Sequence, residues 1–208
     1  MFTRFKNIFC AGLIAAAAFT TSAMAETVLY ENPNVGTTAG GPCSPCGSDF
    51  RSATSFTLGD DSTIGAFEAQ LHDITSGGMQ DVLIEVFSGD LTTSLWSQLV
   101  TTADYTKDTT LGGSYPVVLF DVADFALTAG SYFVSLYGVN GTQFGWPTSP
   151  TPTAGSEWIQ VSGNNLIGGT PQNGGLGIRV LGTVDVPAPA PLALLGLGIF
   201  AIARRRKS

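Results

Sequence analysis

The chain has 208 residues, and its formal net charge at neutral pH is −7. Six of its nine basic residues stand in the first six or the last five positions, so the stretch from Glu26 to Asp185 keeps three basic residues against all sixteen acidic ones. Such an acidic surface repels phosphate backbones, which excludes nucleic acid as a partner. The stretch of about 160 residues is long enough for one domain with its own core.

The N-terminal residues 1–25 have the features of a secretory signal peptide. Arg4 and Lys6 precede an apolar run, and Ala23-Met24-Ala25 supplies the small side chains of a cleavage site at Ala23 and Ala25. We therefore expect Glu26 to be the first residue of the mature protein. An uncleaved anchor is the alternative, but the apolar run is short for a membrane span.

Two cysteines remain in the mature chain, Cys43 and Cys46, within the sequence Gly-Pro-Cys-Ser-Pro-Cys-Gly. An exported protein occupies an oxidising compartment, so a local disulfide between them is the leading prediction. So short a loop removes little chain entropy, and the bond would fix the loop rather than the fold. A metal site and a redox motif are the alternatives, although a redox motif calls for a helix that the flanking Gly and Pro do not favour.

Strand patterns fill the rest of the domain. The clearest is at residues 81–87, where Val82, Ile84 and Val86 share one face. Further strands are predicted at residues 50–58, 64–74, 94–100, 115–122, 131–137, 158–161 and 177–184. Gly-rich turns separate them and no amphipathic helix is evident. We therefore expect an all-β fold, a single jelly-roll-like β-sandwich over residues 26–184.

Three stretches are predicted to be long loops, at residues 32–48, 140–156 and 163–175. Phe144 and Trp146 lie in the second stretch, and Trp158 follows it closely. Rings on exposed loops can stack on sugars, which makes a carbohydrate-binding module one alternative for the domain. Against this, aromatic side chains of a sandwich usually pack in the core or at its rim.

An enzyme is not predicted, and no catalytic residue is assigned. The mature chain has one histidine, His72, and no Gly-x-Ser-x-Gly motif, so a Ser-His-Asp triad has little support. Glu68, Glu85 and Glu157 could serve a glycosidase. They are scattered among solvent-facing positions, however, where solvation alone explains them.

No cofactor is predicted either. Asp60-Asp61 and the pair Asp121 and Asp124 could bind a structural calcium ion through carboxylate oxygens. Their spacing is not that of an EF-hand, and solvated turns are the simpler explanation. No metal ligand is therefore assigned.

The C-terminal residues 185–208 have three ordered parts. A Pro-rich hinge contains Val186, Pro187, Ala188 and Pro189, an uncharged apolar segment begins at Leu192 and ends at Ala203, and a basic cluster follows at Arg204, Arg205, Arg206 and Lys207. As a helix, the apolar segment would rise about 18 Å, against roughly 30 Å of hydrocarbon. The basic cluster would stay on the cytoplasmic side. The segment therefore suits a transient anchor, with a permanent transmembrane helix as the alternative.

These three parts resemble the PEP-CTERM sorting signal of Gram-negative bacteria that make extracellular polysaccharide. Ala188 stands where that signal typically has Glu, so this is a variant Pro-x-Pro motif. The resemblance implies processing by exosortase, a membrane-embedded enzyme similar to a cysteine transpeptidase. The domain is also similar to a recurring cargo of this system, in residues 56–58, 61–64, 82–88 and 127–132 and in Trp146.

The resemblance implies a location more than a chemistry. We expect export across the inner membrane, transient anchoring there, and a final place at the cell surface or in the extracellular matrix of a biofilm. The expected function is that of a non-enzymatic surface or matrix protein associated with exopolysaccharide. A carbohydrate-binding module is the alternative, and a glycosidase is less favoured.

Overall fold

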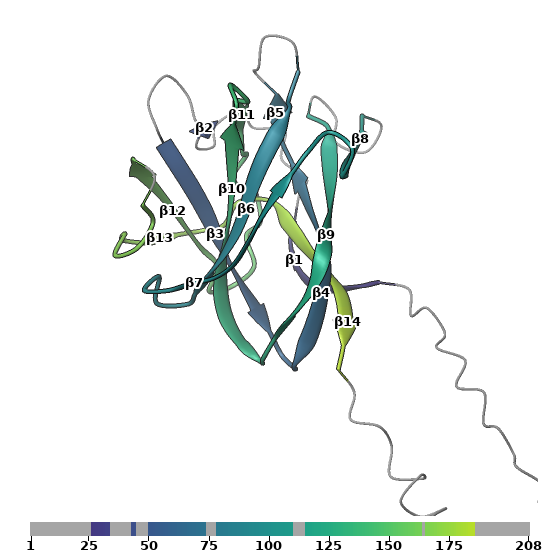
Figure 1. Ribbon diagram of the computed structural model, residues 1–208. Helices are drawn as coiled ribbons and strands as arrows, with labels where there is room; N and C mark the ends of the chain where they lie inside the picture. Colours follow the sequence, from purple (N-terminus) through teal and green to yellow (C-terminus); the bar gives the residue numbers. More distant parts are fainter. Residues whose placement is uncertain are drawn as a thin grey trace, which may run out of the picture.

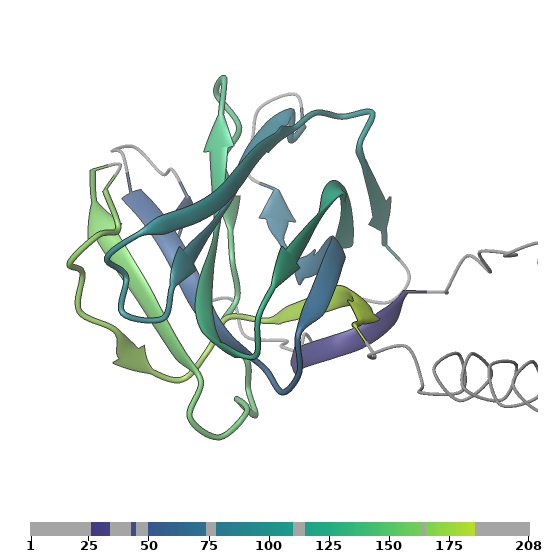
Figure 2. The ribbon, with the colours of Figure 1, turned by 60° about the horizontal axis from the view of Figure 1, so that its bottom comes forward.

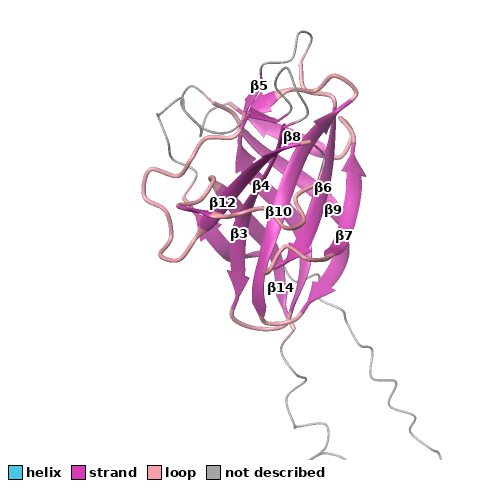
Figure 3. Ribbon diagram, turned by 90° about the vertical axis from the view of Figure 1, so that its left-hand side faces the viewer, coloured by secondary structure: helices cyan, strands magenta, loops and turns pink. Residues whose placement is uncertain are grey.

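The computed structural model describes residues 26–33, 43–44, 50–73, 78–109, 115–163 and 165–185. Across these ranges the chain forms strands and no helix (Figure 1). The strands build two large antiparallel sheets that face each other, so the all-β sandwich predicted from the sequence is confirmed (Figures 2 and 3). The predicted signal peptide and the C-terminal segment from Val186 onwards lie outside the described residues. Where the chain is described, it contains no helix long and apolar enough to cross a membrane.

The first sheet has five strands in the order β1-β14-β4-β9-β8. Their bounds are β1 Thr27–Asn32, β14 Ile178–Val184, β4 Ser62–Gln70, β9 Val117–Leu127 and β8 Tyr105–Asp108. The last strand of the domain, β14, lies inside this sheet, with β1 on one side and β4 on the other. Both neighbours run antiparallel to it, so hydrogen bonds hold it along both edges.

The second sheet has six strands in the order β13-β12-β3-β10-β6-β7. Their bounds are β13 Gln172–Asn173, β12 Glu157–Ser162, β3 Phe50–Leu58, β10 Gly130–Val139, β6 Asp81–Ser88 and β7 Ser94–Val100. A small sheet of β2 (Cys43–Ser44), β11 (Phe144–Gly145) and β5 (His72–Asp73) lies at the top of Figure 1. The turns from β3 to β4 and from β9 to β10 lie at the bottom.

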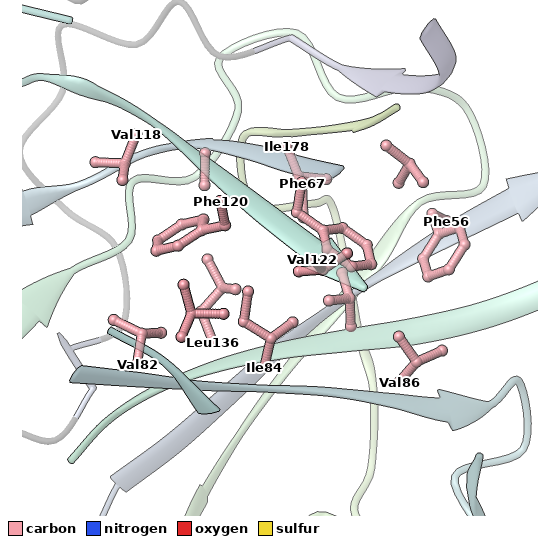
Figure 4. Close-up of a cluster of buried hydrophobic side chains, with 14 of the residues drawn as sticks. Phe56, Phe67, Val82, Ile84, Val86, Val118, Phe120, Val122, Leu136 and Ile178 are labelled. Atoms are coloured by element: carbon pink, nitrogen blue, oxygen red, sulfur yellow. The ribbon is translucent and has the colours of Figure 1, made fainter. Parts of the chain in front are cut away.

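Side chains from both sheets meet in one main core (Figure 4). Phe56 and Ile84 come from the six-stranded sheet, Phe67 and Phe120 come from the five-stranded sheet, and all four are fully buried. The rings of Phe56 and Phe67 meet edge to face, with 6.5 Å between their centroids. Burying one such side chain contributes roughly 1.5–3 kcal/mol, so this core is the main source of stability.

A smaller apolar cluster lies on the outer face of the six-stranded sheet. It joins Phe87, Phe133 and Ile159 to Leu91 and Leu166. Leu166 comes from the segment after β12 and is fully buried against the sheet. The segment therefore covers part of a face that water would otherwise contact.

All eight strands predicted from the sequence are present, although several of their ends are shifted. The predicted inward residues Val82, Ile84 and Val86 are fully buried. Two strands of four or more residues were not predicted, β1 and β8. Both lie at the edges of the five-stranded sheet and expose about half of their side chains, so neither has the alternation of a half-buried strand.

Candidate functional site at the exit of the C-terminal segment

Asp185, the last described residue, is held against the start of β4. Its backbone N–H donates to the carbonyl of Asp61 at 2.8 Å, and its carboxylate accepts from the Thr63 hydroxyl at 3.1 Å. Both partners stand beside the end of β14. The fold therefore holds the chain up to the residue directly before Val186-Pro187-Ala188-Pro189.

The end of β14 fits closely between its two neighbours. On one side, Thr27 pairs with Gly182, and its hydroxyl donates to the Gly182 carbonyl at 3.2 Å. On the other side, a β-carbon at Gly182 would lie 2.1 Å from the Thr63 carbonyl oxygen, so only glycine fits. Because Thr27 begins β1, the chain enters the domain beside the point where it leaves (Figure 1).

Two turns flank this exit. Residues 59–61 join β3 to β4, and residues 128–129 join β9 to β10. The Asp61 carboxylate connects the two turns, since it accepts the backbone N–H of Ala129 at 2.8 Å. We refer to residues 59–62, residues 128–130 and Asp185 together as the exit pole.

Carboxylates dominate the exit pole, where Asp60, Asp61 and Asp185 are all exposed. The described basic residues lie towards the opposite ends of their strands. They are Arg51, the second residue of β3; Arg179, the second residue of β14; and Lys107, which pairs with Val118 near the start of β9. Because β3, β9 and β14 all end at the pole, none of these three basic residues lies at the exit, although carboxylates such as Asp81 and Asp108 also stand at the opposite end.

All three described basic residues have contacts away from the exit pole. Arg179 donates to Glu31 at 2.8 Å and to Glu68 at 2.9 Å, both on the five-stranded sheet. The ammonium of Lys107 lies 5.8 Å from the centroid of the Tyr105 ring. These two positive charges therefore contact residues of the five-stranded sheet and do not offset the carboxylates of the exit pole.

Arg51 forms a largely buried ion pair on the outer face of the six-stranded sheet. Its guanidinium binds the Glu85 carboxylate and donates from Nε to the Ser135 hydroxyl at 3.0 Å. It also lies 5.5 Å from the ring centroids of Phe87 and of Tyr137. The side chains of Arg51 and Glu85 are 7% and 16% exposed. The opposite charge of each therefore offsets the cost of removing the other from water.

Another group of carboxylates lines a pocket of about 410 Å³ on the outer face of the five-stranded sheet. Glu26, Asp104 and Asp121 contribute acidic side chains, and Leu119 contributes apolar surface. Partial burial, together with the charges of Asp121 and Asp124, raises the pKa of Glu26 above its usual value. The pocket therefore repels further negative charge.

The structure rules out the alternative in which Phe144 and Trp146 are exposed glycan contacts. Both side chains are fully buried in the main core, and the Trp146 indole donates to the Gly177 carbonyl at 2.9 Å. Pairing of β11 with β2 and β5 draws this segment into the end of the sandwich. Trp158 is half-buried and packs against the same core. Phe144 and Trp146 therefore cannot stack on a sugar.

The candidate catalytic carboxylates lie apart. Glu68 faces outwards from the five-stranded sheet and Glu85 from the six-stranded sheet, so the sandwich separates them. Glu157 shares the face of Glu85 but stands three strands away, which is about 14 Å at the usual strand spacing. A glycosidase holds its two carboxyl groups about 5–9.5 Å apart.

His72 is exposed on β5, and its ring lies 4.8 Å from that of Tyr115. In the part of the chain that the structure describes, no three His, Cys, Asp or Glu side chains gather to hold a metal ion. A structural calcium ion at Asp60-Asp61 or at Asp121 and Asp124 stays an untested alternative to solvated turns.

Several predicted site residues lie outside the described residues. Cys43 belongs to β2 and pairs with Gly145, but Cys46 is not described, so the disulfide stays a prediction. The same holds for the cleavage site at Ala23 and Ala25. It also holds for the Pro-rich motif, the apolar segment 192–203 and the basic cluster 204–207.

Residues 185–207 match the family model of the PEP-CTERM protein-sorting motif. The match begins at the residue that the fold holds against β4, and it confirms the resemblance found in the sequence. No curated protein matches the chain. The motif identifies an exported protein that is sorted through its C-terminus and processed by exosortase.

Proposed function

We propose that the chain is a non-enzymatic protein of the cell surface or extracellular matrix, delivered by its C-terminal signal and associated with exopolysaccharide. The junction at Asp185 carries this proposal, because the sorting motif begins at a residue that the folded domain still holds by hydrogen bonds. The sorting motif therefore follows the β-sandwich domain directly. Cleavage within the motif would leave one intact β-sandwich.

The placement of the charged and aromatic side chains supports a role without catalysis. Glu85 is paired with Arg51 and Glu68 with Arg179, so each has a structural partner. The Trp146 side chain is fully buried in the main core, so it is not available to bind a ligand. An excess of negative charge over the domain favours a soluble body that does not self-associate through its charged faces.

The association with polysaccharide follows from the setting that the sorting motif implies, and we assign no side chain to it. Co-sedimentation of the processed protein with exopolysaccharide from the same cells tests it. Retention in the polysaccharide pellet is expected. Release of sugar that a Glu68→Gln or Glu157→Gln variant abolishes would instead establish a glycosidase.

Fractionation of cells with and without the processing enzyme tests the delivery. With the enzyme, the domain should be found at the surface or in the medium. Without it, the full-length chain should accumulate in the membrane fraction. Equal surface delivery in both strains would refute the proposal.

A further inference from the structure

We propose that the exit pole is the surface on which the processing enzyme docks, and that the enzyme presents a basic surface to Asp60 and Asp61. This inference rests on the proposed processing of the C-terminal segment. It adds a docking site on the folded body, outside the sorting motif itself.

Only a few residues separate Asp185 from the Pro-rich motif, so an enzyme that binds the motif must lie close to the domain. Val186-Pro187-Ala188-Pro189 lies one to four residues beyond Asp185, so even a fully extended chain places Pro189 within about 14 Å of that residue. An enzyme that encloses this motif must bring its own surface up to the domain. The surface it meets is the exit pole.

Detaching the end of β14 to lengthen the chain before the motif would cost the domain buried contacts and hydrogen bonds. Ile178 and Val180 of β14 are fully buried, and both edges of the strand are paired. Releasing its end would break the pairing of Gly182 with Thr27 and both hydrogen bonds of Asp185. The enzyme must therefore approach the folded body.

Charge selects the kind of partner that fits. Asp60, Asp61 and Asp185 are exposed at the pole, and no basic residue belongs to it to offset their charge. Opposite charge on a partner speeds encounter and fixes orientation. A bilayer with anionic lipids has the wrong sign for such a pole, so a basic protein surface is the occupant that the charges favour.

Pulse–chase processing of the full-length chain, in cells that contain the enzyme, tests the docking. The pole variant Asp60→Asn/Asp61→Asn removes two charges and keeps an oxygen that can accept from Ala129. A matched control, Asp81→Asn/Asp108→Asn, removes two charges at the opposite end, where Asp81 pairs with Val139 and Asp108 with Val117. Thermal unfolding checks that both variants are folded.

We expect the pole variant to be processed about threefold to tenfold more slowly, as charge removal at the rim of an interface slows association. The control should match the unmodified chain. A short Gly-Ser spacer inserted after Asp185 should abolish the difference, because the enzyme then reaches the motif without touching the pole. Unchanged processing of the pole variant, or slowing that the spacer does not relieve, would overturn the docking site. An unmodified chain that is never processed would contradict the proposed function instead.

Discussion

The Thr63 hydroxyl donates a hydrogen bond of 3.1 Å to the carboxylate of Asp185, across 122 positions of sequence. This bond joins the start of β4 to the last residue before the Pro-rich motif. With the Asp61 carbonyl as a second partner, Asp185 becomes part of the folded domain. The base of the sorting signal is therefore positioned by the cargo.

Replacing Thr63 with Val tests this bond, because the substitution keeps the β-branched shape and removes only the hydroxyl. The bond is exposed, so the free energy of unfolding should fall by no more than about 1 kcal/mol. Hydrogen exchange at the Asp185 amide should nevertheless become faster. Thr57→Val, which removes a hydroxyl contact to Ser131 on the other sheet, is the control. Equal protection of the Asp185 amide in both variants would contradict the assignment.

Gly182→Ala should destabilise the domain by about 1–3 kcal/mol, since the backbone must shift to admit a side chain. The added carbon would meet the Thr63 carbonyl oxygen, which belongs to the neighbouring strand and cannot rotate away. Gly59→Ala is the matched control, because no atom lies within 4 Å of its β-carbon position. Chemical denaturation of the two variants measures the difference, and similar midpoints would show that β14 is less closely fitted.

Trp146→Ala should cost about 3–5 kcal/mol of unfolding free energy, through the cavity that it leaves. The hydrogen bond from its indole to the Gly177 carbonyl is lost as well. Trp146→Phe, which keeps most of the ring volume, should cost less. If Trp146→Ala left the unfolding midpoint unchanged, the ring would have to lie on the surface.

Arg51→Met should destabilise the domain strongly, by about 3–5 kcal/mol, because it leaves the carboxylate of Glu85 partly buried without its charge partner. The double variant Arg51→Met/Glu85→Met should be more stable than the single one. Arg179→Met breaks a more exposed pair and should cost about 1 kcal/mol or less. Chemical denaturation of the three variants measures these differences. Equal losses of unfolding free energy for Arg51→Met and Arg179→Met would show that Arg51 does not compensate the charge of Glu85.

The acidic pocket predicts a pH dependence. Burial, Asp121 and Asp124 raise the pKa of Glu26, so the folded domain holds this proton more tightly than the unfolded chain does. The stabilising effect is complete in acid and is lost as the pH rises through the folded pKa. Asp124→Asn removes one repelling charge, so it should stabilise the domain at neutral pH by less than about 1 kcal/mol, because Glu26 is largely exposed. Thermal unfolding in acid and at neutral pH measures this, and a gain confined to acid would contradict it.

The local patterns of the sequence predict much of this fold. Alternation at Val82, Ile84 and Val86 identifies β6 and its inward face correctly, and the turn at Asp60-Asp61 is exposed as expected. The sequence left open whether Trp146 is buried, because its burial depends on pairings with distant segments, which no local pattern records. The exit pole was missed for the same reason, since β1, β4 and β14 meet there from three separate parts of the chain.

The sorting motif predicts that a folded, exported body is delivered through a C-terminal segment that is then removed. Intact-mass analysis of the mature protein, from cells with an intact processing enzyme, shows whether the segment is removed. We predict one species that begins at Glu26 and lacks residues 192–208. A mature species that retains residues 192–208 in those cells would show that the segment is not removed.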